Sequence, residues 1–102
     1  MNKRLAFLEQ LVEGGKADSF ARYALALEYK KEGRTDDALR VFEGLRSSDP
    51  AYVPQYLMAG SLLSGAGRTD EARSWLEAGI SAARSSGDSH ALGELESALG
   101  AL

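Results

Sequence analysis

The chain repeats itself with a period of 34 residues. Residues 19–52 align with residues 53–86 without a gap, and both segments carry the tetrapeptide Gly-Arg-Thr-Asp at the same place, 33–36 and 67–70. A fixed period of roughly 20 to 50 residues is typical of stacked units that bury a continuous core only by packing on their neighbours. The period therefore favours a repeat architecture over a fold in which every element is unique.

Apolar and small residues follow a helical period inside each repeat. The spacing i, i+3, i+4, i+7 occurs twice in the first repeat, at residues 22, 25, 26 and 29 and at residues 38, 41, 42 and 45. Because this spacing defines one stripe of a helix, we expect two helices per repeat, at about 19–32 and 36–47 in the first. Gly33 would end the first helix in a left-handed conformation. Thr35 would cap the second helix through its hydroxyl group.

The segments on either side continue the pattern. A shift of 34 residues lays residues 3–13 on the second helix of the first repeat, with Phe7, Leu8 and Leu11 on its apolar stripe. A shift of 36 residues lays residues 88–100 on the first helix of the second repeat. We therefore expect a half-repeat helix at the first segment and a capping helix at the second.

These residues resemble the tetratricopeptide repeat family. The first repeat carries family signature residues at Leu25, Ala26, Tyr29, Gly33, Ala38, Phe42 and Pro50. The second repeat keeps Tyr56, Gly60, Gly67 and Ala72 but departs from the family pattern at Leu63, Gly79 and Arg84. The resemblance implies an all-α fold, a right-handed superhelical stack of antiparallel helix pairs (an α-solenoid) with about six helices. It implies a single domain over residues 1–102 that works as an adaptor or scaffold in protein–protein interaction.

The resemblance also implies a concave groove, where a peptide or helix of a partner protein docks on the first helices of the repeats. The groove residues implied by the family register are Phe20, Tyr23, Leu27, Lys30, Lys31, Leu57 and Ser61. His90 and Ser97 of the capping helix would extend this surface. Apolar side chains gathered on a surface usually mark an interface, and the two lysines would orient an acidic group. The alternative to a binding surface is intramolecular burial, in which the N- or C-terminal helix of the chain covers these side chains.

The main alternative to partner binding is self-association. Residues 98–102 form an apolar tail without a charged side chain, which could occupy the groove of its own or of a neighbouring copy. Two full repeats are also fewer than the roughly three that a stable stack usually needs. On this hypothesis the chain is a structural homo-oligomer.

Composition and motifs give no support to catalysis or nucleic-acid binding. The net charge is −3 with Lys and Arg scattered along the chain, whereas nucleic-acid-binding proteins present a basic face. There is no cysteine. The single histidine, His90, stands beside Asp88 and Ser89, too near in sequence for a catalytic triad. One histidine among scattered carboxylates does not make a metal site. We therefore expect no enzyme activity, no cofactor and no metal.

Two further expectations concern location and the tryptophan. No apolar run approaches the roughly 20 residues that cross a bilayer, and no secretory apolar segment is present. We therefore expect a cytoplasmic protein that makes no membrane contact. Trp75 falls on the apolar stripe of its helix, so we expect it in the core rather than at a binding surface.

Overall fold

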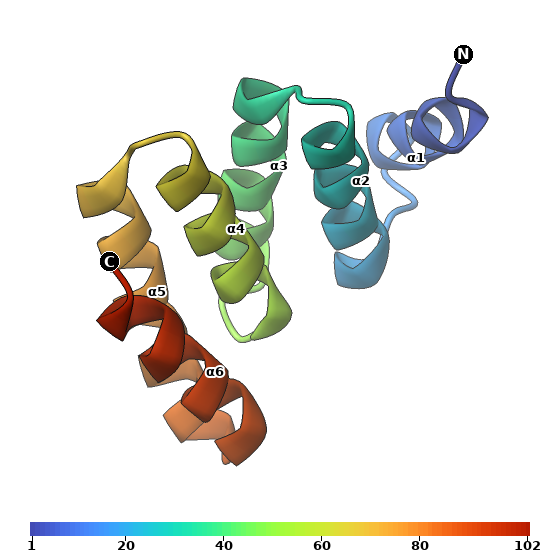
Figure 1. The fold of residues 1–102 in the computed structure, drawn as a ribbon. Helices are drawn as coiled ribbons and strands as arrows, with labels where there is room; N and C mark the ends of the chain where they lie inside the picture. The colour runs from blue at the N-terminus through green and yellow to red at the C-terminus, as the bar shows by residue number, and fades with distance from the viewer. The chain divides into compact units, whose positions relative to one another are not determined.

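The computed structural model describes residues 1–102 and consists of α-helices joined by short loops, without any β-strand (Figure 1). The helices are α1 (Lys3–Glu13), α2 (Ser19–Lys31), α3 (Thr35–Ser48), α4 (Pro54–Gly65), α5 (Thr69–Ser86) and α6 (Ser89–Gly100). The chain divides into two compact units, Met1–Asp49 with α1 to α3 and Pro50–Leu102 with α4 to α6. The predicted all-α class is confirmed, and six helices form as expected.

The turn inside each repeat forms as the repeated tetrapeptide predicts. Gly33 and Gly67 have φ angles of 76° and 77°, in the left-handed region that glycine enters without a steric penalty. Behind the first of these glycines, the Arg34 amide donates to the Tyr29 carbonyl oxygen at 2.9 Å, and the equivalent bond recurs in the second repeat at 2.9 Å. These bonds satisfy carbonyl groups that the end of a helix leaves without an intrahelical donor.

The predicted hydroxyl cap at Thr35 is wrong. Thr35 is already the first helical residue of α3, and its predecessor Arg34 occupies the capping position without a side-chain cap. A helical first residue cannot direct its hydroxyl at the next free amides as a capping residue does. Instead the Arg34 guanidinium donates to the Asp37 carboxylate at 2.8 Å, and Arg68 makes the same pair with Glu71 at 2.8 Å before α5. The two carboxylates also lie at the positive end of the helix dipole.

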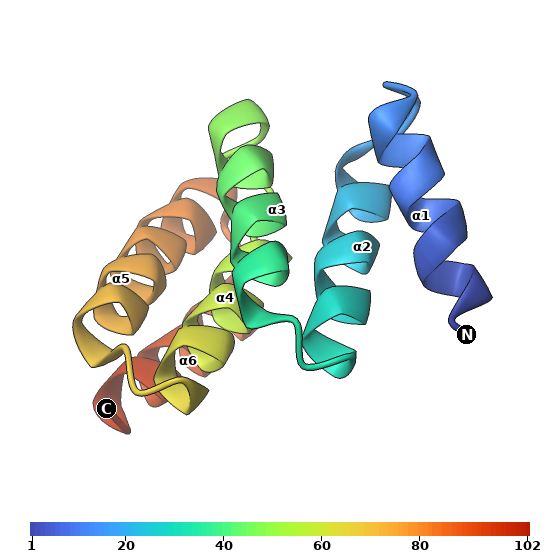
Figure 2. The same ribbon diagram turned by 90° about the horizontal axis from the view of Figure 1, so that it is seen from above.

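The first unit is built around the α2–α3 pair, with α1 on the other side of α2 (Figure 2). Ala26 on α2 and Ala38 on α3 are fully buried, as close helix approach requires. Phe42 is also fully buried, and its ring centroid lies 6.5 Å from that of Tyr23. Small residues where the helices approach and aromatic residues beside them form the core of this repeat.

The predicted apolar stripe of α1 is only partly right. Leu8 is buried as expected, but the second buried residue is Leu5 rather than Phe7, which is 60% exposed. Leu11 is half-buried. Within its unit α1 packs on α2, so only a narrow face with Leu5 and Leu8 is covered. A shift along the repeat assigns a stripe but does not give the number of neighbours that cover it.

The second unit packs α4, α5 and α6 around a glycine. A side chain at Gly79 would begin 2.5 Å from the Tyr56 Cβ atom and 2.9 Å from the Leu95 Cδ2 atom. The three helices therefore meet closely at this point of α5. Trp75 packs beside it, with its ring centroid 5.9 Å from that of Tyr56, and is 8% exposed. The prediction that Trp75 belongs to the core is confirmed.

Candidate partner-binding surfaces

Five of the seven predicted groove residues lie on α2. Phe20, Tyr23, Leu27 and Lys30 follow one another at intervals of three, four and three residues, so they share one face of the helix, here called the α2 stripe. Phe20 is 65% exposed. Tyr23, Leu27 and Lys30 are half-buried. The stripe is thus partly supported by the core, through the contact of Tyr23 with Phe42, and partly open.

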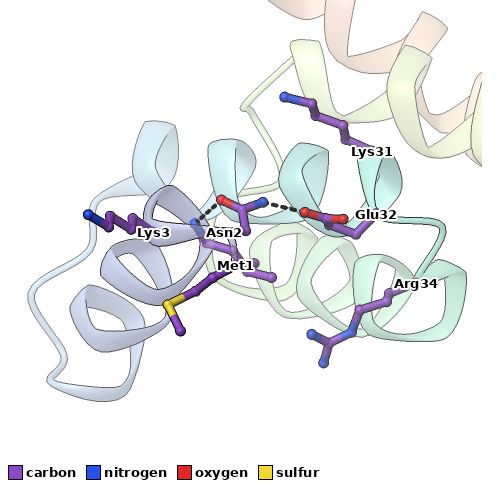
Figure 3. Close-up of a pocket in the computed structure, with 7 residues that line it drawn as sticks. Met1, Asn2, Lys3, Lys31, Glu32 and Arg34 are labelled. Atoms are coloured by element: carbon purple, nitrogen blue, oxygen red, sulfur yellow. Dashed lines mark hydrogen bonds between the residues drawn. The ribbon is translucent and has the colours of Figure 1, made fainter.

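The fifth α2 residue, Lys31, lines a pocket of about 780 Å³ where the start of α1 faces the end of α2 (Figure 3). The residues that line this basic pocket are Met1, Asn2, Lys3, Leu5, Lys31, Glu32 and Arg34. Three of these side chains are cations, and Glu32 is the only carboxylate among them. In Figure 3 the amino groups of Lys3 and Lys31 point away from the hydrogen bond between Asn2 and Glu32.

A polar network fixes the floor of the basic pocket. The Asn2 side-chain amide donates to the carboxylates of Glu32 and Glu28, at 2.5 and 3.0 Å, while its oxygen accepts from the Leu5 amide and caps α1. Arg4 adds an ion pair to Glu28 at 3.1 Å. Because these contacts satisfy both carboxylates, the two lysine amines at the rim remain available to an incoming anion.

The core side of the same region is held by Tyr29. Its hydroxyl donates to the Glu9 carboxylate at 2.5 Å and joins α2 to α1. Burial, together with this hydrogen bond to a carboxylate, raises the pKa of the Tyr29 hydroxyl to about 12. The Arg34 guanidinium lies 4.6 Å from the centre of the Tyr29 ring and is hydrogen-bonded to Asp37, whose pKa it lowers. Arg34 is therefore held in place, unlike the two lysines.

In the second unit, Leu57 lies in a groove of about 670 Å³ between α4 and α6. The residues that line this α4–α6 groove are Leu57, Ser89, His90, Gly93, Glu94, Ser97, Ala98 and Ala101. The expected neighbours His90 and Ser97 are among them. Ser61 is exposed on α4 but does not line the groove. Ala98 and Ala101, which belong to the predicted apolar tail, line this groove in their own unit.

The polar residues at the start of α6 are arranged as a helix start rather than as a catalytic group. The Asp88 carboxylate accepts from the Ala91 amide at 3.0 Å and caps α6. His90 is exposed, and its Nε2 atom lies 3.2 Å from Glu94 one turn later. No group of three His, Cys, Asp or Glu side chains could hold a metal ion. None of the six helices is both long enough and apolar enough to span a membrane.

Sequence reasoning missed most of the basic pocket. Lys3 and Arg34 carry no repeat signal that connects them with Lys31, because they meet only when the start of α1 packs against the end of α2. Asn2 was missed for the same reason. The helix-start position of Asn2 was the one available signal, since asparagine is a favoured capping residue.

Comparison with known proteins agrees with this architecture. The family model described as tetratricopeptide repeat matches residues 29–95. A tetratricopeptide repeat domain protein from Salinibacter ruber is 41% identical to this chain. The alignment with its crystal structure covers 81% of this chain and 92% of the Salinibacter chain, with a TM-score of 0.76. A solution structure of such a domain protein from the same organism also has a TM-score of 0.76, covering 80% of this chain and 83% of its own.

A second organism provides a similar structure. The solution structure of a protein from Bordetella parapertussis is 29% identical and covers 97% of this chain and 86% of its own, with a TM-score of 0.81. No protein with curated annotation matches the sequence. The similar structures therefore bear on the fold, and their names do not identify a partner.

Proposed function

Because this chain belongs to the tetratricopeptide repeat family, we propose that it is an interaction module that binds a peptide or helix of a partner protein on the α2 stripe. Tetratricopeptide repeats form a protein–protein interaction fold without catalytic machinery of their own.

The exposure of Phe20 carries the proposal. Phe20 is 65% exposed and is one of three large exposed apolar side chains in the chain. On the same face of α2 it is followed by the half-buried Tyr23 and Leu27. Burying such a ring against a partner would contribute about 1 to 2 kcal/mol, from the roughly 1.5 to 3 kcal/mol of full burial scaled by its exposure. Apolar residues of a partner helix at i, i+3 and i+7 would match the spacing of the stripe.

The basic residues at the end of α2 supply orientation. Lys30 lies on the stripe, and Lys31 lies at the rim of the basic pocket with Lys3. An acidic side chain of the partner would therefore be favoured at the Lys30 end, and an apolar one at the Phe20 end. Leu57 and Ser61, which the family register implies for the second repeat, are further proposed contact residues, and Leu57 is the apolar one of the two. Binding is reversible docking, and no bond is made or broken.

The proposal is tested with peptides selected from a random library on the wild-type protein. We expect the selected peptides to be amphipathic and acidic, and Leu27→Glu or Phe20→Glu to weaken their binding at least tenfold in fluorescence anisotropy. Phe7→Glu is the matched control, since Phe7 has a similar exposure of 60% but lies on α1. Equal affinity for wild type and for both α2 variants would show that the peptides bind elsewhere.

The tail hypothesis is a second candidate, favoured by one observation. Ala98, in the last turn of α6, and Ala101 line the same α4–α6 groove as Leu57, so the tail lies on the groove that holds a predicted contact residue. If the tail limits access to this groove, a chain that lacks residues 98–102 should bind the selected peptides more tightly than the full chain. Unchanged affinity, with helix content retained in circular dichroism, would exclude the tail as a competitor.

A further inference from the structure

We propose that two copies of this chain form a weak dimer through α1, with the two α1 helices antiparallel across a two-fold axis. The contact uses the side of α1 that faces away from α2, here called the outer face of α1. Its residues are Lys3, Ala6, Phe7, Gln10 and Glu13. The α2 stripe takes no part in this contact, so the dimer is independent of the proposed function.

The outer face of α1 is open and has an apolar centre. Its residues follow one another at intervals of three or four, so they share one side of the helix. All of them are exposed, and Phe7 is 60% exposed. On the opposite side, Leu5 and Leu8 are buried where α1 packs on α2 (Figure 2). Phe7 is therefore directed away from the core of its unit.

The charges at the two ends of α1 are opposed to its helix dipole. The start of a helix favours acidic side chains, and its end favours basic ones. Both α3 and α5 follow this rule, with acidic residues in the first turn and an arginine in the last. In contrast, α1 begins with Lys3, ends with Glu13, and has no acidic residue in its first turn and no basic residue in its last. Stabilisation of α1 itself therefore explains neither charge.

These two charges are also unused within the chain. The side chains of Lys3 and Glu13 form no ion pair in their own molecule. In Figure 3 the amino group of Lys3 points away from the neighbouring hydrogen bond of Asn2. The other charged residues of α1 do have partners, since Arg4 pairs with Glu28 and Glu9 accepts from Tyr29. A cation and an anion at opposite ends of one open face are thus left for a second molecule.

A second copy in antiparallel orientation provides the matching charges. When Lys3 of one copy lies level with Glu13 of the other, the two-fold axis creates the same pair at the other end. Each end of one helix dipole then also lies beside the opposite end of its neighbour. A parallel pair would instead bring lysine to lysine and glutamate to glutamate. Because the face is complementary in charge to its own antiparallel copy, the occupant that fits it is this chain itself.

This register places Phe7 at the centre of the contact. The two helices cross at the level of Leu8, so the two Phe7 residues lie about 3 Å apart along the axes, from a rise of about 1.5 Å per residue. Two aromatic rings at that offset can stack on each other at the two-fold axis. Ala6 of one copy lies level with Gln10 of the other, and its small side chain allows the helices to approach.

Like charges stay apart in the same register. The two Lys3 residues are separated by about 15 Å along the axes, and the two Arg4 residues by about 12 Å. Both separations exceed the Debye length of about 8 Å at physiological ionic strength. Arg4, whose side chain pairs with Glu28 at 3.1 Å beside the outer face, therefore does not oppose the contact.

The size of the contact sets its strength. With 11 residues, α1 is about 16 Å long. A single helix of this length paired with its copy belongs to the interfaces below about 1,200 Å², which are typical of transient complexes. The same surface is used on both copies, so the contact is isologous and closes at two molecules. We therefore expect monomers in dilute solution, dimers at high concentration and no larger species.

Sedimentation equilibrium tests the contact over a concentration series that reaches about 1 mM, where even a millimolar Kd gives a measurable dimer. We expect the mass to rise from 10.9 kDa towards twice that value and no further. Phe7→Glu should weaken dimerisation at least tenfold. Phe20→Glu, at a position with a similar exposure of 65% on α2, should dimerise like the wild type.

Three results of this series would overturn the proposal. The first is a mass that stays at 10.9 kDa throughout. The second is growth beyond the dimer, because an isologous contact cannot extend. The third is dimerisation that survives Phe7→Glu or is lost in Phe20→Glu, since the contact would then lie outside α1 or include the α2 stripe.

Charge reversal separates loss of the contact from loss of folding. Lys3→Glu and Glu13→Lys each place like charges at both ends of the pair, so each should weaken dimerisation at least fivefold. Each exchange also brings α1 into agreement with its own dipole. The monomeric variants should therefore melt no lower than the wild type in circular dichroism at dilute concentration. A lower melting temperature together with lost dimerisation would mean that these side chains act inside the chain, against the proposal.

Combining the two exchanges tests the antiparallel register. An equal mixture of the Lys3→Glu and Glu13→Lys proteins should form a dimer with one copy of each, and a chain that carries both exchanges should dimerise with itself as tightly as the wild type. Recovery in the mixture alone would mean that the helices are parallel. Recovery in neither, with helix content retained, would mean that the charges do not meet. Either result would refute the antiparallel pair.

Discussion

Replacing Gly79 by alanine provides a sharp test of the packing in the second unit. Gly79 lies inside α5, where alanine is favoured over glycine by about 1 kcal/mol through helix propensity. Against this gain, the new Cβ atom would begin 2.5 Å from the Tyr56 Cβ atom and 2.9 Å from a methyl group of Leu95. The Tyr56 Cβ atom is fixed to the backbone of α4, so a rotamer change cannot relieve the contact.

The magnitude follows from these opposing effects. Overpacking a core costs about 1 to 3 kcal/mol, and a contact with a backbone-fixed atom belongs at the upper end. Subtracting the propensity gain leaves Gly79→Ala destabilised by about 1 to 2 kcal/mol, and a small domain loses about 4 to 8 °C in Tm per kcal/mol. The assay is urea unfolding followed by circular dichroism and by the fluorescence of Trp75, which lies in the same unit.

Gly93→Ala is the matched control. Gly93 lies inside α6 in the same unit, and nothing lies within 4 Å of a Cβ atom built there. This variant should therefore gain up to about 1 kcal/mol from propensity alone. The reasoning is refuted if Gly79→Ala is as stable as the wild type or more stable, because α4 and α6 would then not be in contact with α5 at this residue.

Three further predictions concern the first unit and the effect of pH. Phe42→Ala should lower the free energy of unfolding by about 3 to 5 kcal/mol in a urea titration, because Phe42 is fully buried. The pKa of Tyr29 is higher in the folded protein than the ordinary tyrosine value of about 10. The stability that this difference contributes is fully present below pH 10 and is lost as the pH rises through about 12. Tyr29→Phe should therefore make the free energy of unfolding, followed by circular dichroism, less dependent on pH over that window. The lowered pKa values of Asp37 and Glu71 act in the opposite direction, because they stabilise the fold at neutral pH and this stabilisation is lost as the pH falls below about 4. The double variant Asp37→Asn with Glu71→Gln should therefore lose less stability than the wild type in an acid unfolding curve.

The positions of the helices could be predicted from the sequence because they depend on local information. The glycine of each tetrapeptide sets a left-handed turn, and apolar spacing sets the helices on either side, so the predicted range 19–32 differs from α2 by one residue. The prediction of Trp75 in the core succeeded for the same reason, since one repeat served as a template for the other.

Features that depend on tertiary neighbours could not be predicted in this way. Phe7 was placed on a buried stripe by the repeat shift, but α1 packs only on α2 within its unit and leaves Phe7 exposed. Thr35 was assigned a capping role from its residue type, although the helix begins at Thr35 itself. The basic pocket joins Lys3 to Lys31 across two helices, and no periodic pattern encodes that meeting.

The central claim is that the α2 stripe is the surface that a partner contacts. The most direct test is a nuclear magnetic resonance titration of the labelled protein with a peptide selected on the wild type, at concentrations where the chain is monomeric. We predict that resonances of Phe20, Tyr23 and Leu27 shift first and furthest, followed by those of Lys30. Shifts confined to α1 or to the outer side of α5, with the α2 stripe unchanged, would contradict the account.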